Sequence, residues 1–198
     1  MGLRPGRCYR KIHRPYTRQS QKKPRKGYVK GVPKSKITQF EFGKKGNYDT
    51  AVYLLSDNDV QIRHNSLDSA RVVVVQYMEK AMGKNPQFLM RVRVFPHHVI
   101  RENCLATGAG ADRFQSGMRQ SFGQPIGTAA QVRKNQKIIE IQVNKNNINI
   151  AKTALKKASY KLPTTTTIKI EEIKIPFVTH EYFQRAKLSE SSNKLACL

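Results

Sequence analysis

Positive charge is concentrated at the N-terminal end of this chain. Residues 1–36 contain 13 lysines and arginines and no carboxylate, and the first acidic residue is Glu41. Only four of these 36 residues are Leu, Ile, Val or Phe, a share of about 11% that lies below the roughly 20% at which chains tend to stay unfolded. The sequence therefore predicts a basic extended arm over residues 1–36, outside the hydrophobic core.

The composition of this arm favours contact with nucleic acid. Tyr9, His13, Tyr16 and Tyr28 are interleaved with four prolines, which favour extended backbone and block helices. Arginines can bind phosphates along such a segment, and aromatic rings can stack on unpaired bases. Basic runs such as Lys22–Lys26 would equally suit a solvated tail or a nuclear-import signal. Nucleic acid is the better interpretation because the net charge is +24 and the rest of the chain is basic as well.

Residues 37–178 form the predicted globular domain, and residues 179–198 a C-terminal appendage. Alternating and β-prone runs predict strands at Ile37–Phe42, Ala51–Ser56, Val60–His64, Phe88–Phe95, Gly127–Val132, Lys137–Val143 and Thr165–Ile175. Helical spacing and capping residues predict helices from an N-cap at Ser66 to Gly83, from Asp112 to Phe122 and around Ile150–Ala158. This order predicts an α+β fold, a two-layer α/β sandwich in which helices cover a mostly antiparallel sheet.

No pattern in the sequence indicates catalysis. Gly108-Ala109-Gly110 lacks the third glycine of a dinucleotide-binding loop, because Arg113 stands at that position. Adjacent His97 and His98 cannot both face one metal site from a strand or helix. A nucleophile pair of Cys104 and His98 has no support beyond residue identity. We therefore expect no catalytic residue, no metal and no cofactor.

Cysteine usage and hydropathy indicate a soluble intracellular protein. No stretch of about 18 apolar residues occurs, and the N-terminal segment has no apolar signal region. Cys8, Cys104 and Cys197 are far apart and odd in number, so we expect reduced thiols and not a disulfide framework.

The predicted strand Phe88–Phe95 has one half-basic face. Its apolar residues at even positions share one face, and Arg91 and Arg93 lie on the other. Their separation of about 7 Å is close to the spacing of successive phosphates on one nucleic-acid strand. A solvated strand face would have the same pattern, so this observation alone is weak.

Small residues dominate a predicted loop at 101–112, which is flanked by Arg101 and Arg113. Glycine and alanine allow backbone amides to approach phosphates and sugars closely. The segment reads Pro96-His97-His98-Val99-Ile100-Arg101-Glu102-Asn103-Cys104-Leu105-Ala106-Thr107-Gly108-Ala109-Gly110-Ala111-Asp112-Arg113 and continues into Gly117-Met118-Arg119-Gln120-Ser121-Phe122-Gly123 and Gly127-Thr128-Ala129-Ala130.

This stretch resembles the archaeal and eukaryotic large-subunit ribosomal protein ten-e family, the counterpart of bacterial large-subunit ribosomal protein sixteen. Further matching motifs are Arg14-Pro15-Tyr16-Thr17-Arg18, Gly31-Val32-Pro33-Lys34-Ser35-Lys36-Ile37, Gln61-Ile62-Arg63-His64 and Lys161-Leu162-Pro163. They follow the family's order over roughly residues 8–175. The chain departs from the family pattern at Gln124 and Gln131, where Lys and Arg are usual, so we do not carry those two phosphate contacts over.

The resemblance implies a structural constituent of the large ribosomal subunit, located in the cytoplasm, with no membrane association and no homo-oligomer. Its expected partners are large-subunit rRNA near the central protuberance, the vicinity of the 5S rRNA, tRNA and neighbouring large-subunit proteins. The resemblance also implies that one loop approaches the tRNA acceptor end, and its residues are Asn103, Cys104, Leu105, Ala106, Thr107, Gly108, Ala109, Gly110 and Ala111. The alternative is a non-ribosomal basic RNA-binding protein or a ribosome-assembly factor.

The residues expected to bind rRNA are cations of the arm, of the predicted strand Phe88–Phe95 and of the matching motifs, with one tyrosine. They are Arg4, Arg7, Arg10, Lys11, Arg14, Tyr16, Arg18, Lys34, Lys36, Arg63, Arg91, Arg93, Arg101, Arg113 and Arg119.

Overall fold

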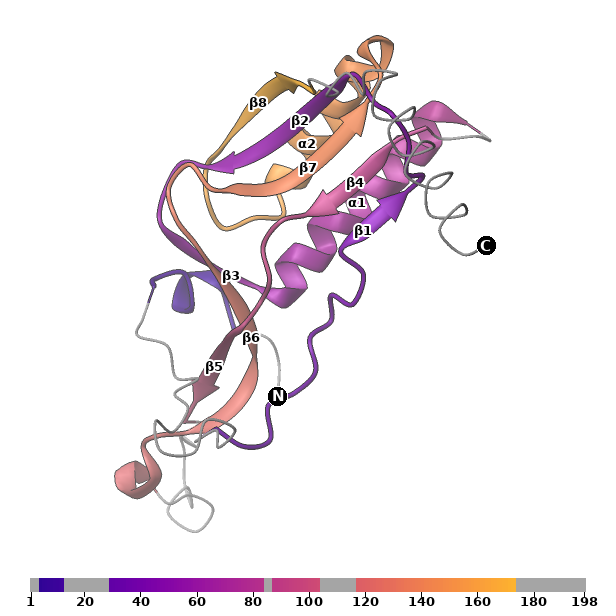
Figure 1. Ribbon diagram of the computed structural model, residues 1–198. Helices are drawn as coiled ribbons and strands as arrows, with labels where there is room; N and C mark the ends of the chain where they lie inside the picture. The colour runs from indigo at the N-terminus through magenta and orange to yellow at the C-terminus, as the bar shows by residue number, and fades with distance from the viewer. Residues whose placement is uncertain (1–3, 13–28, 84–86, 104–116, 174–198) are drawn as a thin grey trace, which may run out of the picture.

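The protein contains two antiparallel sheets and two α-helices in the residues that its structure, a computed structural model, describes (Figure 1). These are residues 4–12, 29–83, 87–103 and 117–173. In chain order the elements are η1 (Gly6–Cys8), β1 (Glu41–Gly43), β2 (Thr50–Ser56), β3 (Val60–Arg63), α1 (His64–Met82), β4 (Leu89–Val92), β5 (His98–Glu102), η3 (Gly117–Gln120), β6 (Gln124–Val132), β7 (Lys137–Val143), η4 (Lys145–Asn147), α2 (Ile148–Ser159) and β8 (Thr166–Glu172). The predicted α+β class is confirmed.

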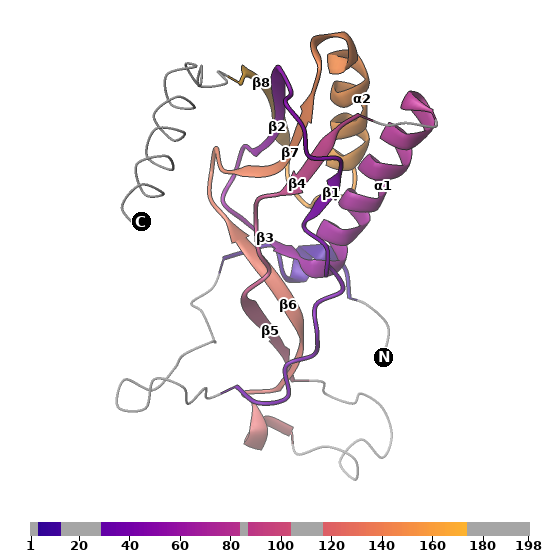
Figure 2. The same cartoon turned by 45° about the vertical axis from the view of Figure 1, so that its right-hand side comes forward.

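The strands are divided between a body and a projecting ribbon. The larger sheet has the order β1-β4-β7-β2-β8, and every neighbouring pair is antiparallel. The smaller sheet has the order β3-β6-β5. Figure 2 shows both helices on one side of the larger sheet, whereas β5 and β6 extend away from it. Helices therefore cover one face of the five-stranded sheet and leave the other face open.

The hydrophobic core lies between this sheet and the two helices. From β2 and β7, Val52, Leu54, Ile139 and Ile141 are completely buried, as the period-two alternation of a half-covered sheet requires. The predicted apolar face of the fourth strand is also confirmed, because Phe88, Met90, Val92 and Val94 are all buried. Apolar side chains at even positions thus place Arg91 and Arg93 on the open face.

Both predicted amphipathic helices are present. Helix α1 buries Leu67, Ala70, Val74, Val75 and Met78, and α2 buries Ala151, Ala154, Leu155 and Ala158. Gly83 ends α1 with a φ of 74°, a left-handed conformation that glycine adopts without steric cost. The predicted N-cap at Ser66 is wrong, because α1 begins at His64 directly after β3 and Arg63 is the N-cap.

The predicted loop at 101–112 begins inside a strand. Strand β5 covers His98–Glu102 and pairs with β6 from His98 opposite Ala129 to Glu102 opposite Gln124. No alternation marks this strand in the sequence, because three buried residues are followed by two charged ones. Residues 104–116 lie outside the described part of the chain, and these include the first five residues of the predicted helix at Asp112–Phe122. Of the rest of that helix, Gly117–Gln120 form the short 3-10 helix η3.

Two smaller differences concern the ends of strands. The strand predicted at Ile37–Phe42 starts late, since β1 covers Glu41–Gly43, although Phe40 already accepts a hydrogen bond from the Val92 N–H at 2.8 Å. The last strand ends at Glu172.

Part of the predicted arm lies against the body. The backbone N–H of Gln61 in β3 donates to the carbonyl of Arg10 at 2.9 Å, and the Gln61 side-chain amide donates to the carbonyl of Tyr9 at 3.1 Å. Ile37, at the predicted boundary, is buried in the core cluster. Residues 13–28 lie outside the described residues, and the predicted division into 1–36, 37–178 and 179–198 stays a prediction.

We expect Gly43→Ala to destabilise the protein by about 2 kcal/mol. Gly43 has a φ of 100°, and an added Cβ would overlap the carbonyl oxygen of Phe88, which accepts the Lys44 N–H. Gly46→Ala is the matched control, because its added Cβ would meet only the Tyr48 ring at 3.7 Å. Chemical denaturation measures both variants, and equal stability of the two would contradict the expectation.

Candidate nucleic-acid interface

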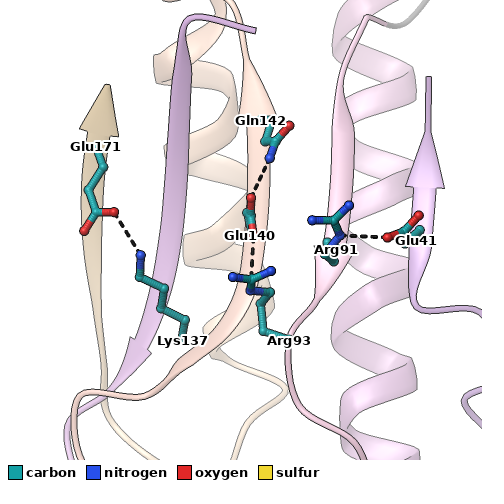
Figure 3. A network of polar contacts seen from close by, with 7 residues as sticks. All are labelled: Glu41, Arg91, Arg93, Lys137, Glu140, Gln142 and Glu171. Atoms are coloured by element: carbon teal, nitrogen blue, oxygen red, sulfur yellow. Dashed lines mark hydrogen bonds and ion pairs between the residues drawn. The ribbon is translucent and has the colours of Figure 1, made fainter. Parts of the chain in front are cut away.

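The open face of the five-stranded sheet carries cations and carboxylates in matched pairs (Figure 3). Arg91 Nε lies 2.8 Å from Glu41 Oε1, and Arg93 Nε lies 3.2 Å from Glu140 Oε2. The Arg91 charge, followed by that of Lys45, lowers the pKa of Glu41. Arg91 and Arg93, both predicted to bind rRNA, therefore already have partners within the protein.

Of these two ion pairs, the one between Arg93 and Glu140 is the more costly to break. Glu140 is only 3% exposed, and its second oxygen accepts a hydrogen bond from Gln142 Nε2 at 2.6 Å. A buried carboxylate that loses its cation is strongly destabilising. If a phosphate replaced Glu140 as the partner of Arg93, Glu140 would remain buried without a cation.

The same matching continues toward β8. Lys137 Nζ lies 2.9 Å from Glu171 Oε2 and 3.5 Å from the centre of the Tyr53 ring. The hydrogen bond from Lys137 lowers the pKa of Glu171, and Lys169 Nζ lies 3.0 Å from the other oxygen of this carboxylate. The charges of the open face are thus largely neutralised by one another.

A second polar cluster joins the N-terminal segment to the ribbon. The Tyr9 hydroxyl donates to Glu102 Oε2 at 2.7 Å, and the Arg4 guanidinium forms an ion pair with Glu102 Oε1. Arg63 Nη1 donates to the Arg4 carbonyl at 2.9 Å, and its guanidinium lies 5.2 Å from the centre of the Tyr9 ring. Burial, and then the hydrogen bond to Glu102, raise the pKa of Tyr9 to about 12. Glu102 thereby holds residues 4–9 against the end of β5.

His64 connects the segment 33–36 to the start of α1. Its Nδ1 accepts the backbone N–H of Lys36 at 3.0 Å. Burial, followed by the charges of Lys36 and Arg63, lowers the pKa of the ring, so the imidazole is neutral near pH 7. Since Nδ1 is an acceptor, Nε2 carries the proton. This edge faces Gly127, where an added Cβ would lie 3.1 Å from Nε2.

Several predicted rRNA contacts have no carboxylate partner among the described residues, in contrast to Arg91 and Arg93. These cations are Arg7, Arg10, Lys11, Lys34, Lys36, Arg63 and Arg119. All except Arg119 belong to the N-terminal segments or to the β3–α1 junction. Among the predicted rRNA contacts, the cations without a carboxylate partner therefore lie mostly where those segments meet the ribbon.

The two ends of the predicted tRNA-facing loop are fixed together. Arg101 Nη1 donates to the Phe122 carbonyl at 2.7 Å, and its guanidinium lies 3.0 Å from the centre of the Phe122 ring. Gly123 has a φ of 71°, and an added Cβ would lie 2.6 Å from the Glu102 carbonyl oxygen. Of the predicted loop residues Asn103–Ala111, only Asn103 is among the described residues, and Arg14, Tyr16, Arg18 and Arg113 also lie outside them.

Gln131 departs from the family pattern and has an internal role. Its side-chain nitrogen lies 3.5 Å from Gln61 Oε1 and 3.4 Å from His98 Nδ1, two side chains that are buried.

The roles of Glu102 and His64 could not be predicted from the sequence, because their partners are 93 and 28 residues away along the chain. Among the residues described, no group of His, Cys, Asp or Glu is arranged to hold a metal ion, and no helix is long and apolar enough to cross a membrane.

Comparisons with known proteins agree with the resemblance. The family model described as ribosomal protein L16p/L10e matches residues 15–169. A large ribosomal subunit protein uL16 of Sulfolobus acidocaldarius is 46% identical over 176 residues, which cover 87% of this chain and 96% of the relative. The uL16 proteins of Metallosphaera sedula and Methanococcus aeolicus are 48% and 45% identical, over 88% and 86% of this chain and 97% and 95% of their own lengths.

We expect Tyr9→Phe to lower the free energy of unfolding by about 1 kcal/mol, because it removes the hydrogen bond to the Glu102 carboxylate and keeps the ring. Tyr160→Phe is the control, since Tyr160 is 75% exposed. Chemical denaturation gives the stabilities, and proteolysis reports release of residues 4–9. A Tyr9→Phe protein as stable as the control would show that this contact contributes nothing.

Proposed function

Because the chain belongs to the ribosomal protein L16p/L10e family, we propose that it is a structural constituent of the large ribosomal subunit and binds rRNA. The observation that carries this proposal is the match to uL16 proteins over most of both chains. Membership in a family of ribosomal proteins agrees with the prediction that the chain is not an enzyme.

The distribution of charge distinguishes the open sheet face from the surface formed by the N-terminal segments and the β3–α1 junction. On the open sheet face, Glu41, Glu140 and Glu171 hold the nearby cations, so this face offers little net charge to phosphates. Lys34, Lys36 and Arg63, with Arg7 and Arg10, are the cations that bind rRNA phosphates in our proposal. Phosphate contacts of this kind supply most of the salt-dependent affinity for nucleic acid.

The finer assignments rest on the family resemblance. In our proposal the protein lies near the central protuberance, beside the 5S rRNA and the tRNA corridor, within the cytoplasmic large subunit. The loop Asn103–Ala111 approaches the tRNA acceptor end. Two features support this role: the ribbon extends away from the body (Figure 1), and the loop sequence Asn103–Ala111 contains no charged residue.

The proposed division of the chain follows from the same argument. Residues 1–36 thread through rRNA, residues 37–178 are the rRNA-binding body, and residues 179–198 are an appendage. The structure adds that residues 4–12 contact β3, so the rRNA-threading segment in our proposal is the part that follows residue 12.

We expect a tagged copy of the protein to sediment with the large subunit through a moderate salt wash, at one copy per mature subunit. A ribosome-assembly factor, the alternative function, would be present only on precursor subunits. Quantitative mass spectrometry of gradient fractions distinguishes the two. Recovery of the protein in free form, or only on precursors, would contradict the proposal.

We expect deletion of residues 104–111 to leave incorporation into subunits nearly intact and to impair tRNA-dependent steps. Asn103 is kept because Gly123 packs against its backbone. Replacement of the same residues by a glycine-serine segment of equal length is the control for loop length. Subunit incorporation and dipeptide synthesis are the two measurements, and subunits that lack the deletion variant would contradict this division of roles.

A further inference from the structure

We propose that a cavity between the N-terminal segment, the start of α1 and the β5–β6 ribbon binds one unstacked nucleotide of the bound RNA. This inference rests on the proposed function, because it names the chemical group that one site on the rRNA-binding surface accepts. It goes further in assigning a base-binding pocket where the charges alone indicate only phosphate contacts.

The cavity has the size of a small-ligand site. Its volume is about 410 Å³, within the roughly 300–1,000 Å³ of pockets that bind small molecules. Five separate parts of the chain line it, which are residues 4–9, residues 33–36, the β3–α1 junction, and strands β5 and β6.

Positive charge at the cavity exceeds negative charge. Glu102 is the only carboxylate among the lining residues that the structure describes, and Arg4 already neutralises it. Lys34, Lys36 and Arg63 have no carboxylate partner among the described residues, and Arg63 donates only to a backbone carbonyl. Three cations around one opening suit a phosphate group.

Apolar surface on the ribbon side suits a flat base. Ile100 and Ile126 contribute aliphatic side chains, and Ile126 is 43% exposed, although it belongs to a strand whose next six residues are mostly buried. Gly127 leaves the wall open beside His64 because it has no side chain. A surface that carries only phosphate contacts has no need of such an apolar wall.

Polar groups that can read a base edge lie in the same lining. The neutral His64 carries its proton on Nε2, and this nitrogen lies on the side of Gly127. Asn65 Oδ1 accepts the Ser66 N–H at 2.9 Å, so the Asn65 amide group still has N–H donors. Recognition of RNA by proteins commonly combines stacking of a splayed base with hydrogen bonds to its edge.

The first test compares nucleotides with phosphate on the full-length protein. The four nucleoside 5′-monophosphates and inorganic phosphate are titrated separately, and methyl signals of isoleucine are followed by NMR. We expect at least one nucleotide to shift Ile100 and Ile126 saturably, whereas inorganic phosphate shifts only backbone signals of Lys34 and Lys36. Equal shifts from phosphate and nucleotides, or no nucleotide effect at Ile126, would overturn the proposal.

The second test uses a variant in which the pocket is narrower. Gly127→Ala places a methyl group against His64, and we expect nucleotide affinity to fall by about ten-fold, within the range measured for loss of one stacked base. Gly46→Ala is the matched control on the body, because its added Cβ would meet only the ring of Tyr48, which does not line the cavity. Unchanged affinity in Gly127→Ala would overturn the base-binding role.

The two proposals fail in different ways. If the wild-type protein does not sediment with the large subunit, the proposed function fails whatever the nucleotide titrations give. If it does sediment there, but nucleotides act on it only as phosphate does, rRNA binding stands and the base pocket is wrong.

Discussion

The position of the few carboxylates is the constraint on which the rest of this structure depends. The chain has 37 lysines and arginines for 13 aspartates and glutamates, so mutual repulsion of cations opposes a compact state. Glu41, Glu140 and Glu171 stand among the cations of one sheet face, and Glu102 stands at the end of the ribbon. These carboxylates neutralise part of the charge of a strongly basic chain, and Arg7, Lys11 and Arg63 are among the cations that have no carboxylate partner in the described residues.

Much of the body could be predicted from the sequence because it follows short-range periodicity. Strand β7 was predicted with its observed bounds, and α2 covers the helix predicted around Ile150–Ala158. The pairings on the open face could not be predicted, since Arg91 and Glu41 are 50 residues apart and meet only through the register of β1 and β4. Strand spacing indicates that Arg91 and Arg93 share one face, but it does not show the carboxylates opposite them.

The ribbon and the base of its loop depend on contacts that no local pattern encodes. Strand β5 is stabilised by its pairing with β6, and its last residues have no strand-like alternation. Arg101, which is expected to bind rRNA, stacks on Phe122 and donates to its carbonyl. Gly123 belongs to the stretch that resembles the family. The reason for a glycine appears only in the structure, where the backbone of Glu102 leaves no space for a side chain. Contacts of Arg101 and Gly123 thus join the two chain segments from which the predicted loop begins and to which it returns.

The way in which the N-terminal segment is attached explains how it can be ordered and basic at once. Backbone carbonyls of Arg4, Tyr9 and Arg10 accept hydrogen bonds from Arg63 and Gln61, so main-chain groups supply most of the attachment. Only Arg4 uses its guanidinium on a carboxylate. The guanidinium of Arg7 and the ammonium of Lys11 have no carboxylate partner among the residues described, so their full charge stays available to an anion. Attachment through ion pairs would have consumed the charge that gives the segment its affinity for phosphate, whereas attachment through carbonyls and one phenol preserves it.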